Sequence, residues 1–289
     1  MILSAELLPF PRVAKAKIGP IDIARKALAA LALALIFYVA ATSLLIAVYR
    51  FVDPSATVLM IYRKYGYGWE LKPPRPVALK RIPPYIRSML IAAEDGKFYD
   101  HFGLDFEAFA RARRVNAAIG KPVYGGSTLT MQVARTLFLV PEKSYLRKCL
   151  EVVAALELEI LLPKNRILEL YFGYAEWGKG VFGIEAAARR WFGVGASALS
   201  REQAARLVAL LSSPIVYRPD NLERSGILRD RYTYLARRFI TPRLEKAAPG
   251  AAAVGPEPPA TDAMPATGTE APPLDAPPGD ASPPPSAAS

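Results

Sequence analysis

The chain has 289 residues, of which 52% are hydrophobic, so it can bury the core of one large domain or two small ones. Its formal net charge is +11, but the last 43 residues, from Ala247, carry five acidic and no basic side chains, so the positive excess lies before them. One cysteine, Cys149, excludes an internal disulfide, and one histidine, His101, argues against a metal site built from several histidines.

The first element in the chain is an uncharged apolar run from Ala27 to Tyr49. As a helix it would be roughly 35 Å long, enough to cross the hydrocarbon core of a bilayer. A cleaved signal peptide has a shorter apolar region and a small-residue cleavage site, so we predict an uncleaved transmembrane anchor over 27–49. Basic residues precede the run and predict a cytoplasmic segment 1–26, with the rest of the chain outside. They are Arg12, Lys15, Lys17, Arg25 and Lys26.

A carboxylate on an apolar helix face is the first candidate site residue. After segment 50–79, predicted as an irregular connector, a helix is predicted from Pro84 to Asp95, with proline in its first turn. Glu94 comes four residues after Leu90 and therefore falls on the apolar face. Such a carboxylate is costly unless it is paired, protonated or lines a cleft. Glu94 and Asp95 are therefore site candidates, although two solvated acids at a capped helix end would give the same pattern.

Two helices are predicted next. The first, Leu104 to Ile119, mixes aromatic residues with three arginines and is either an ordinary amphipathic surface helix or one that lies on anionic lipid. The second, Leu129 to Leu139, opens after Gly125-Gly126-Ser127-Thr128, where Ser127 or Thr128 can cap its first turn. A helix N-terminus of this kind suits an anion, although a GGST sequence alone is usually only a turn and a cap.

A cluster of charges follows on a long apolar helix predicted from Ser144 to Leu162. Arg147 and Glu151 are four residues apart and Lys148 and Glu151 three, so the three side chains share one face. On an open surface they would form an ion pair worth little. Inside a cleft they would offer two cations for a diphosphate with a carboxylate beside them.

The remaining segments complete a mainly helical prediction. Helices are predicted over Lys164–Phe172, Ile184–Phe192, from Ser200 onward and over Tyr232–Phe239, with a turn at Glu176-Trp177-Gly178. No alternating strand pattern is found, so the predicted fold class is all-α. Segment 247–289 is rich in proline and alanine with almost no large apolar residues, and we predict that it is disordered.

Five segments, in this order, resemble the motifs of the peptidoglycan glycosyltransferases, particularly the monofunctional membrane-anchored type. They are Glu94-Asp95 with Phe98, His101 and Gly103; GGSTLTMQ from Gly125 to Gln132; Arg147-Lys148 with Glu151; Lys164 with Ile167-Leu168-Glu169 and Tyr171; and Gly183 to Ala188 with Trp191-Phe192-Gly193. The match runs from about Lys80 to Pro219, and no penicillin-binding transpeptidase domain is expected.

The chain also departs from the family pattern. Met131 stands where the family has a glutamine, Arg135-Thr136 where it has lysine and asparagine, and Phe172-Gly173 where it has leucine and asparagine. Arg135 keeps a cation, as a planar fork rather than a point charge. Met131 and Gly173 remove polar groups near the expected cleft, which bears on activity or substrate choice.

The resemblance implies a lysozyme-like α-helical domain, over 80–246, that polymerises lipid II into glycan strands with release of undecaprenyl diphosphate. By the same resemblance Glu94 is the catalytic base, and His101 supports its loop. Glu151 helps to activate the leaving group, either directly or through Mg²⁺. The cations that hold the diphosphate would be Arg135, Arg147 and Lys148, and the substrate site would be lined by Asp95, Ser127, Thr128 and Gln132. Mg²⁺ or another divalent cation is the expected cofactor, with no metal ligand assigned.

Location and partners follow from the same resemblance. We expect a single-pass protein of the bacterial cytoplasmic membrane, with its catalytic domain on the periplasmic side and lipid II and the growing glycan as partners. Cell-wall synthesis or division proteins are further expected partners, and a nucleic acid is not. Two other functions fit part of the sequence: a lysozyme-like lytic glycosidase, and a catalytically weak relative that acts as an envelope scaffold. The cations around Arg147 argue against the glycosidase, because hydrolysis has no diphosphate to stabilise.

Overall fold

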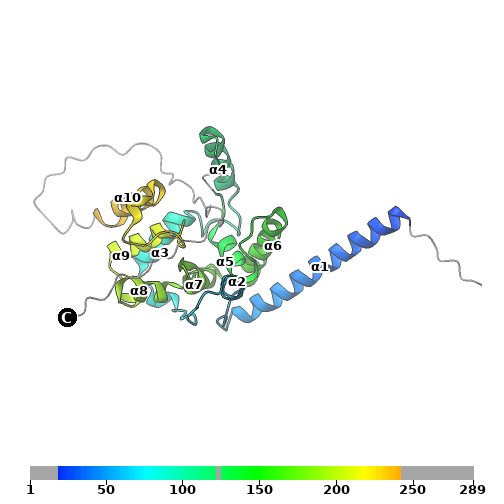
Figure 1. Ribbon diagram of the computed structural model, residues 1–289, viewed down its shortest axis with the longest axis horizontal. Coiled ribbons are helices and arrows are strands. Elements are labelled where there is room, and N and C mark those ends of the chain that lie inside the picture. The colour runs from blue at the N-terminus through cyan, green and yellow to red at the C-terminus, as the bar shows by residue number, and fades with distance from the viewer. Residues whose placement is uncertain (1–18, 122–124, 242–289) are drawn as a thin grey trace, which may run out of the picture. The chain divides into compact units, whose positions relative to one another are not determined.

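The computed structural model describes residues 19–121 and 125–241 (Figure 1). Its first helix, α1 (Pro20–Tyr49), is divided between two compact units, with the boundary between Ala41 and Thr42. Among the described helices, α1 alone is long and apolar enough to cross a membrane. The helix begins earlier than the uncharged run and includes Asp22 in its first turn. The predicted disordered segment 247–289 lies outside the described residues.

The second unit, from Thr42 onward, is mainly helical, as predicted. Its helices are α2 (Val58–Tyr67), α3 (Pro84–Glu94), α4 (Phe106–Ile119), α5 (Leu129–Phe138), α6 (Tyr145–Leu161), α7 (Lys164–Tyr174), α8 (Ile184–Phe192), α9 (Arg201–Leu210) and α10 (Gly226–Phe239). Three short 3₁₀ helices, η1 (Leu79–Arg81), η2 (Ala196–Ala198) and η3 (Leu222–Arg224), lie between them.

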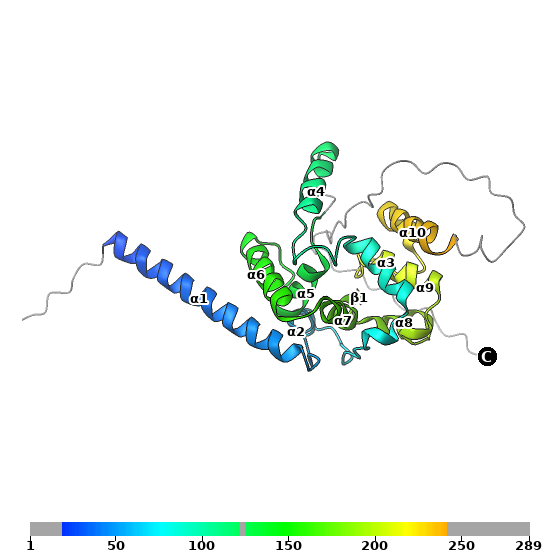
Figure 2. The same ribbon diagram turned by 180° about the vertical axis from the view of Figure 1, so that it is seen from behind.

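The helix α5 forms the centre of this unit. It packs against α2, α6 and α7, and eight of its ten residues are buried, which is the pattern of a core helix rather than a surface one. On the other side of the unit α3, α9 and α10 pack on one another (Figures 1 and 2). The polar residues of α5 therefore need partners inside the protein, and these partners build the site described below.

The helix α4 stands apart from the other helices of this unit in both views (Figures 1 and 2). It begins at Phe106 because the side chain of Asp105 accepts a hydrogen bond from the backbone N–H of Ala108 at 2.9 Å. Only Ala112 of this helix is buried, whereas Phe106 and Phe109 are exposed. The sequence prediction of an amphipathic helix is confirmed, with its apolar side chains largely uncovered.

Two local predictions were wrong. Segment 50–79 is not irregular throughout, because it contains α2 and the start of η1. The residue that fastens α2 to the rest of the fold is Arg63, which is buried, ion-paired with Glu176 at 3.0 Å and stacked 4.8 Å from the ring of Trp69. The turn predicted at Glu176 is instead a small antiparallel hairpin of β1 (Glu176–Gly178) and β2 (Val181–Phe182), with Glu176 opposite Phe182.

Candidate active site

Glu94, the last residue of α3, lies at the centre of a buried polar network. One carboxylate oxygen accepts a hydrogen bond from Nη2 of Arg231 on α10, and the other accepts one from Nε2 of Gln132 on α5 at 2.9 Å. Gln132 in turn accepts a hydrogen bond from the hydroxyl of Tyr171 on α7 at 3.1 Å. The side chains of Glu94 and Arg231 are 2% and 1% exposed, so this is a buried ion pair. A carboxylate on an apolar helix face is expected to be paired, protonated or in a cleft, and Glu94 is paired.

Asp95 points into the protein and joins two motifs. Its carboxylate contacts Nε2 of His101 at 2.9 and 3.0 Å and accepts a hydrogen bond from the backbone N–H of Leu129 at 2.9 Å. Leu129 is the first residue of α5, where a carboxylate is favoured by the free N–H groups and the helix dipole. Asp95 therefore fastens the end of α3 to the start of α5, with His101 supporting the loop that joins α3 to α4.

Thr128 fastens the same loop from the other side. It is the N-cap of α5, accepting a hydrogen bond from the backbone N–H of Met131 at 3.1 Å, and its hydroxyl donates to the carbonyl of Gly103 at 2.7 Å. Gly103 has φ +77°, and a Cβ there would lie 3.0 Å from the side chain of Glu159, so a glycine is required. Thr128 is thus the cap, and its neighbour Ser127 remains available to contact the charged face of α6.

The predicted charged face of α6 is present and half-buried. Glu151 is fully buried and is contacted by Nη1 of Arg147 and by Nζ of Lys148, the latter at 2.9 Å. Lys148 also donates a hydrogen bond to the hydroxyl of Ser127 at 2.8 Å. Burial lowers the pKa of Lys148, the Glu151 carboxylate opposes that shift, and the positive charges of Arg135 and Arg147 lower the pKa further.

The charge of Arg135 influences both the polar network around Glu94 and the charged face of α6. Arg135 lies one helical turn after Gln132 on α5, and its charge acts on Lys148 in one cluster and on Tyr171 in the other. Burial raises the pKa of Tyr171, as does the charge of Glu94, and Arg135 and Arg231 oppose that increase. Arg135 is only partly buried.

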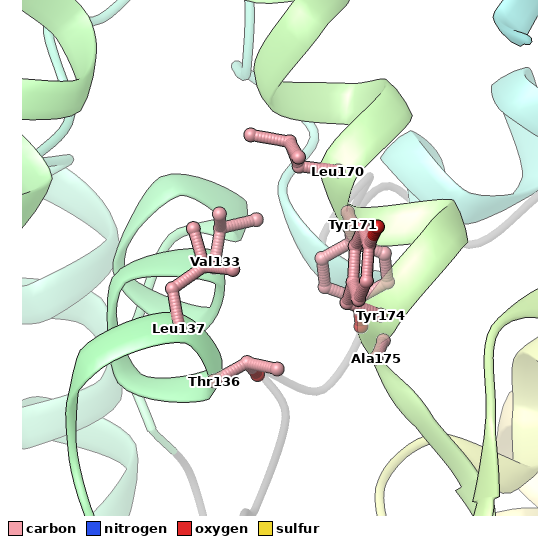
Figure 3. Close-up of a pocket in the computed structure, with 7 residues that line it drawn as sticks. All are labelled: Val133, Thr136, Leu137, Leu170, Tyr171, Tyr174 and Ala175. Atoms are coloured by element: carbon pink, nitrogen blue, oxygen red, sulfur yellow. The ribbon is translucent and has the colours of Figure 1, made fainter. Parts of the chain in front are cut away.

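An apolar hollow lies beside this network, between α5 and α7 (Figure 3). It is too narrow to admit a water molecule and is lined by Val133, Thr136, Leu137, Leu170, Tyr171, Tyr174 and Ala175. No charged side chain is among these residues, so the hollow does not suit a diphosphate. Tyr171 lines it and also supports Gln132, so the hollow adjoins the polar network.

The described residues do not fit a metal site built by the protein. Within the described ranges, no three or more histidine, cysteine, aspartate or glutamate side chains are grouped so as to hold an ion. Both oxygens of Glu151 contact cationic side chains, and both oxygens of Glu94 accept hydrogen bonds.

Comparison with known proteins identifies the family. Residues 68–239 match the family described as Transglycosylase. The chain belongs to the transglycosylase family. Three similar proteins are all named biosynthetic peptidoglycan transglycosylase. The one from Pseudomonas putida (strain W619) is 45% identical over 192 residues, or 64% of this chain and 80% of the relative. Those from Caulobacter vibrioides and Pseudomonas fluorescens (strain Pf0-1) are 43% and 40% identical, over 59% and 70% of this chain and 73% and 88% of the relatives.

Two of the departures from the transglycosylase pattern are buried. Gly173 is buried at the end of α7, where a Cβ would lie 3.3 Å from Pro76, and its carbonyl is packed against Gly183 so closely that a Cβ at Gly183 would clash. Met131 is fully buried within α5. Both are therefore packing positions in this member of the transglycosylase family.

Sequence reasoning missed Arg231, the residue that contacts Glu94 most closely in this transglycosylase. The last helix was predicted only from Tyr232, whereas α10 begins at Gly226 and includes Arg231. A buried arginine looks like any surface arginine in the sequence, because its partner is 137 residues away. The one local sign is that Leu228 and Leu235, three residues before and four after it, are buried on the same face of α10.

Proposed function

We propose that this chain polymerises lipid II into glycan strands and releases undecaprenyl diphosphate. As a member of the transglycosylase family, it is a glycosyltransferase of peptidoglycan synthesis. The observation that carries the proposal is a buried carboxylate, Glu94, bonded to Gln132 of α5, together with the cations Arg147 and Lys148 on α6, which packs against the same helix. A base and a cationic site for a diphosphate are the two elements that an inverting glycosyl transfer needs.

In the proposed reaction Glu94 accepts the proton of the acceptor sugar's 4-hydroxyl as that oxygen attacks the anomeric carbon of the growing chain. The bond from the anomeric carbon to the diphosphate oxygen breaks, and its electron pair leaves with undecaprenyl diphosphate. Arg231 balances the negative charge that Glu94 needs in order to act as a base. Its Nε atom is buried without a hydrogen-bond partner among the described residues, so one donor of this guanidinium is unused.

The leaving diphosphate is stabilised by Arg135, Arg147 and Lys148. Preorganised cations of this kind act most strongly on charge that develops in the transition state. Glu151 holds Arg147 and Lys148 in one geometry, which supports a role in activating the leaving group through them. Ser127, which already contacts Lys148, is a further candidate for the donor site, whereas Asp95 and Thr128 are more suited to positioning the loop than to touching substrate.

Mg²⁺ enters the proposal on the family resemblance alone. A divalent cation brought by the substrate would neutralise part of the diphosphate charge. Polymerisation measured after removal of metals with EDTA, and again after adding Mg²⁺, tests this point. If the EDTA-treated protein polymerises lipid II at its full rate, the reaction does not require a divalent cation.

The proposed location is the bacterial cytoplasmic membrane, with α1 as a single-pass anchor and the helices that follow it, from α2 onward, on the outer side. The length and apolar composition of α1 support the anchor, and the exposed aromatic residues Phe106 and Phe109 of α4 support a contact of that helix with lipid. Cell-wall synthesis or division proteins remain proposed partners.

The test uses purified full-length protein in detergent, incubated with lipid II that carries a labelled sugar. We expect glycan polymer that a muramidase digests, and no soluble fragments when purified peptidoglycan is offered instead. Fragments without polymer would identify a lytic glycosidase. Neither product, from a folded protein that still binds lipid II, would favour the scaffold function.

A further inference from the structure

The end of α1 is held to α6 by a buried carboxylate that the proposed reaction does not use. The hydroxyl of Thr42 donates a hydrogen bond to one oxygen of Glu157 at 2.6 Å, and the hydroxyl of Ser43 donates one to the other at 2.8 Å. Thr42 and Glu157 are both buried. All three residues belong to the second unit. We call this set of three side chains the anchor contact.

The anchor contact lies within the segment predicted to cross the membrane. Thr42 belongs to the uncharged run and precedes its last residue, Tyr49, by about 10 Å along the helix axis. The neighbouring side chains of Leu45 and Val48 are exposed and apolar, and so is Ile160, three residues after Glu157, which is 68% exposed. Side chains of this kind are suited to acyl chains. An ionisable residue at such a level is costly unless paired, and in membrane proteins it commonly has a function.

Further contacts extend from the anchor contact to the helices that carry the site. The ring of Tyr49 stacks on Phe138 of α5 with ring centres 6.3 Å apart, and its carbonyl accepts a hydrogen bond from Arg166 of α7 at 2.8 Å. Arg50 donates a hydrogen bond to the carbonyl of Leu161, the last residue of α6, at 3.0 Å. The end of the anchor is therefore attached to α5, α6 and α7, which also bear Arg135, Lys148 and Tyr171 respectively.

We propose that Glu157 is a positioning residue that sets the depth of the α6 cations relative to the membrane. Glu157 lies six residues, or about 9 Å, after Glu151 on the same rigid helix. The diphosphate of a lipid-linked substrate is confined to the membrane surface, so the cations that bind it must be held at that level. Fixing α6 to the last two turns of the anchor provides this constraint. The inference rests on the proposed function, because it assumes a membrane-bound diphosphate substrate.

The first test compares two substrates with the full-length protein in phospholipid vesicles. The variants are Glu157→Leu and the double variant Thr42→Val/Ser43→Ala, which remove the acceptor and the donors respectively. We expect the rate on long-chain lipid II in the vesicles to fall at least about 10-fold, because misplacement by an ångström is costly in catalysis. The rate on a water-soluble, short-chain lipid II analogue should change less than about twofold, since that substrate needs no fixed depth.

Two further variants serve as controls for this comparison. In Glu157→Gln the side-chain oxygen can still accept a hydrogen bond from Thr42, and the amide can donate one to Ser43. This variant should therefore keep most of the wild-type rate on long-chain lipid II. Glu223→Leu alters an exposed glutamate of η3 and should change neither rate. Equal losses on both substrates, with no recovery in Glu157→Gln, would show that Glu157 only stabilises the fold and would overturn the proposal.

A second measurement is independent of activity. Cys149, the one cysteine of the chain, is exposed on α6 and can carry a fluorophore. Quenching by lipids brominated at known depths then reports the level of α6 in the vesicle. We expect the two disruptive variants to shift the quenching profile and Glu157→Gln to keep it. An unchanged profile in all variants would refute the role of Glu157. A protein that shows this shift but makes no polymer would instead refute the proposed function alone.

Discussion

Arg231 and Glu94 form an ion pair that is almost completely shielded from solvent, although 137 residues separate them in the sequence. Arg231 also approaches the carbonyl of Ala93 at 3.4 Å, so its guanidinium lies over the end of α3. Burying two charges is costly, and breaking such a pair by removing one partner leaves the other charge uncompensated. The proposed base therefore also determines how α10 packs on α3.

Arg231→Met should lower the free energy of unfolding by about 3–5 kcal/mol, because it leaves the Glu94 carboxylate buried without its cation. Adding Glu94→Gln to that variant should recover a large part of the loss, since the buried charge is then gone. Denaturant unfolding of the two single variants and the double variant measures this coupling. Strictly additive effects would mean that the two side chains do not interact in solution.

Glu94→Gln should reduce lipid II polymerisation by at least roughly 10²-fold, because the amide cannot accept the proton of the sugar hydroxyl. The amide keeps the size of the side chain and its contact with Gln132. It also leaves the buried Arg231 cation without its carboxylate, so the variant should be less stable, and its rate and lipid II binding are measured at a temperature at which circular dichroism shows it folded. Glu157 is not a neutral control, because its carboxylate is buried and bonded to Thr42 and Ser43. The exposed Glu223 is suitable, and Glu223→Gln should leave the rate unchanged. Near wild-type polymerisation by Glu94→Gln would exclude Glu94 as the base.

Lys148→Ala should lower the polymerisation rate by about 10²-fold, which is typical for the loss of one group that stabilises charge in a transition state. Arg147 remains to pair with Glu151, so the protein should still fold. Lys80→Ala is the matched control, because Lys80 is an exposed lysine at η1. Similar, small effects of the two substitutions would reduce the charged face of α6 to a structural ion pair.

The pH dependence of kcat/KM should identify Lys148 as a partly buried cation. Because burial lowers its pKa below 10.5, the wild-type protein should lose its ammonium, and with it activity, at a lower pH than an ordinary lysine would allow. Arginine stays charged throughout this range, so Lys148→Arg should move the alkaline decline to higher pH, whatever its maximal rate. Superimposable pH profiles for the two proteins would assign the decline to another group.

A reporter enzyme that is active only outside the cytoplasm should be active when it is fused after Phe239. The basic residues before Ala27 predict this orientation through the positive-inside tendency. A second reporter that is active only in the cytoplasm, fused at the same position, serves as the converse control. Activity of the cytoplasmic reporter alone would reverse the orientation and remove access to lipid II displayed on the outer side.

Local sequence patterns predicted the helices well where caps and periodicity agree. The bounds of α8 were predicted without error, and α9 starts at the Ser200–Gln203 capping box as expected. The helix α2 was missed, and the ion-pair partner of its buried Arg63, Glu176, lies far away in the sequence on β1. The charges of α6 could be grouped because they are three and four residues apart. The pairing of Glu94 with Arg231 has no such local spacing and needed the tertiary fold.

The position of the unit boundary inside α1 limits how the apolar N-terminal helix can be exchanged. Residues Thr42 to Tyr49 share one continuous helix with the preceding residues, yet they pack as part of the second unit, and Ile46 is completely buried. A hybrid protein that joins a foreign membrane helix at Arg50 would lose this packed segment, whereas a junction between Ala41 and Thr42 preserves it. The last two turns of this helix therefore have the packing requirements of a protein core, and hydrophobicity alone does not describe which residues are acceptable there.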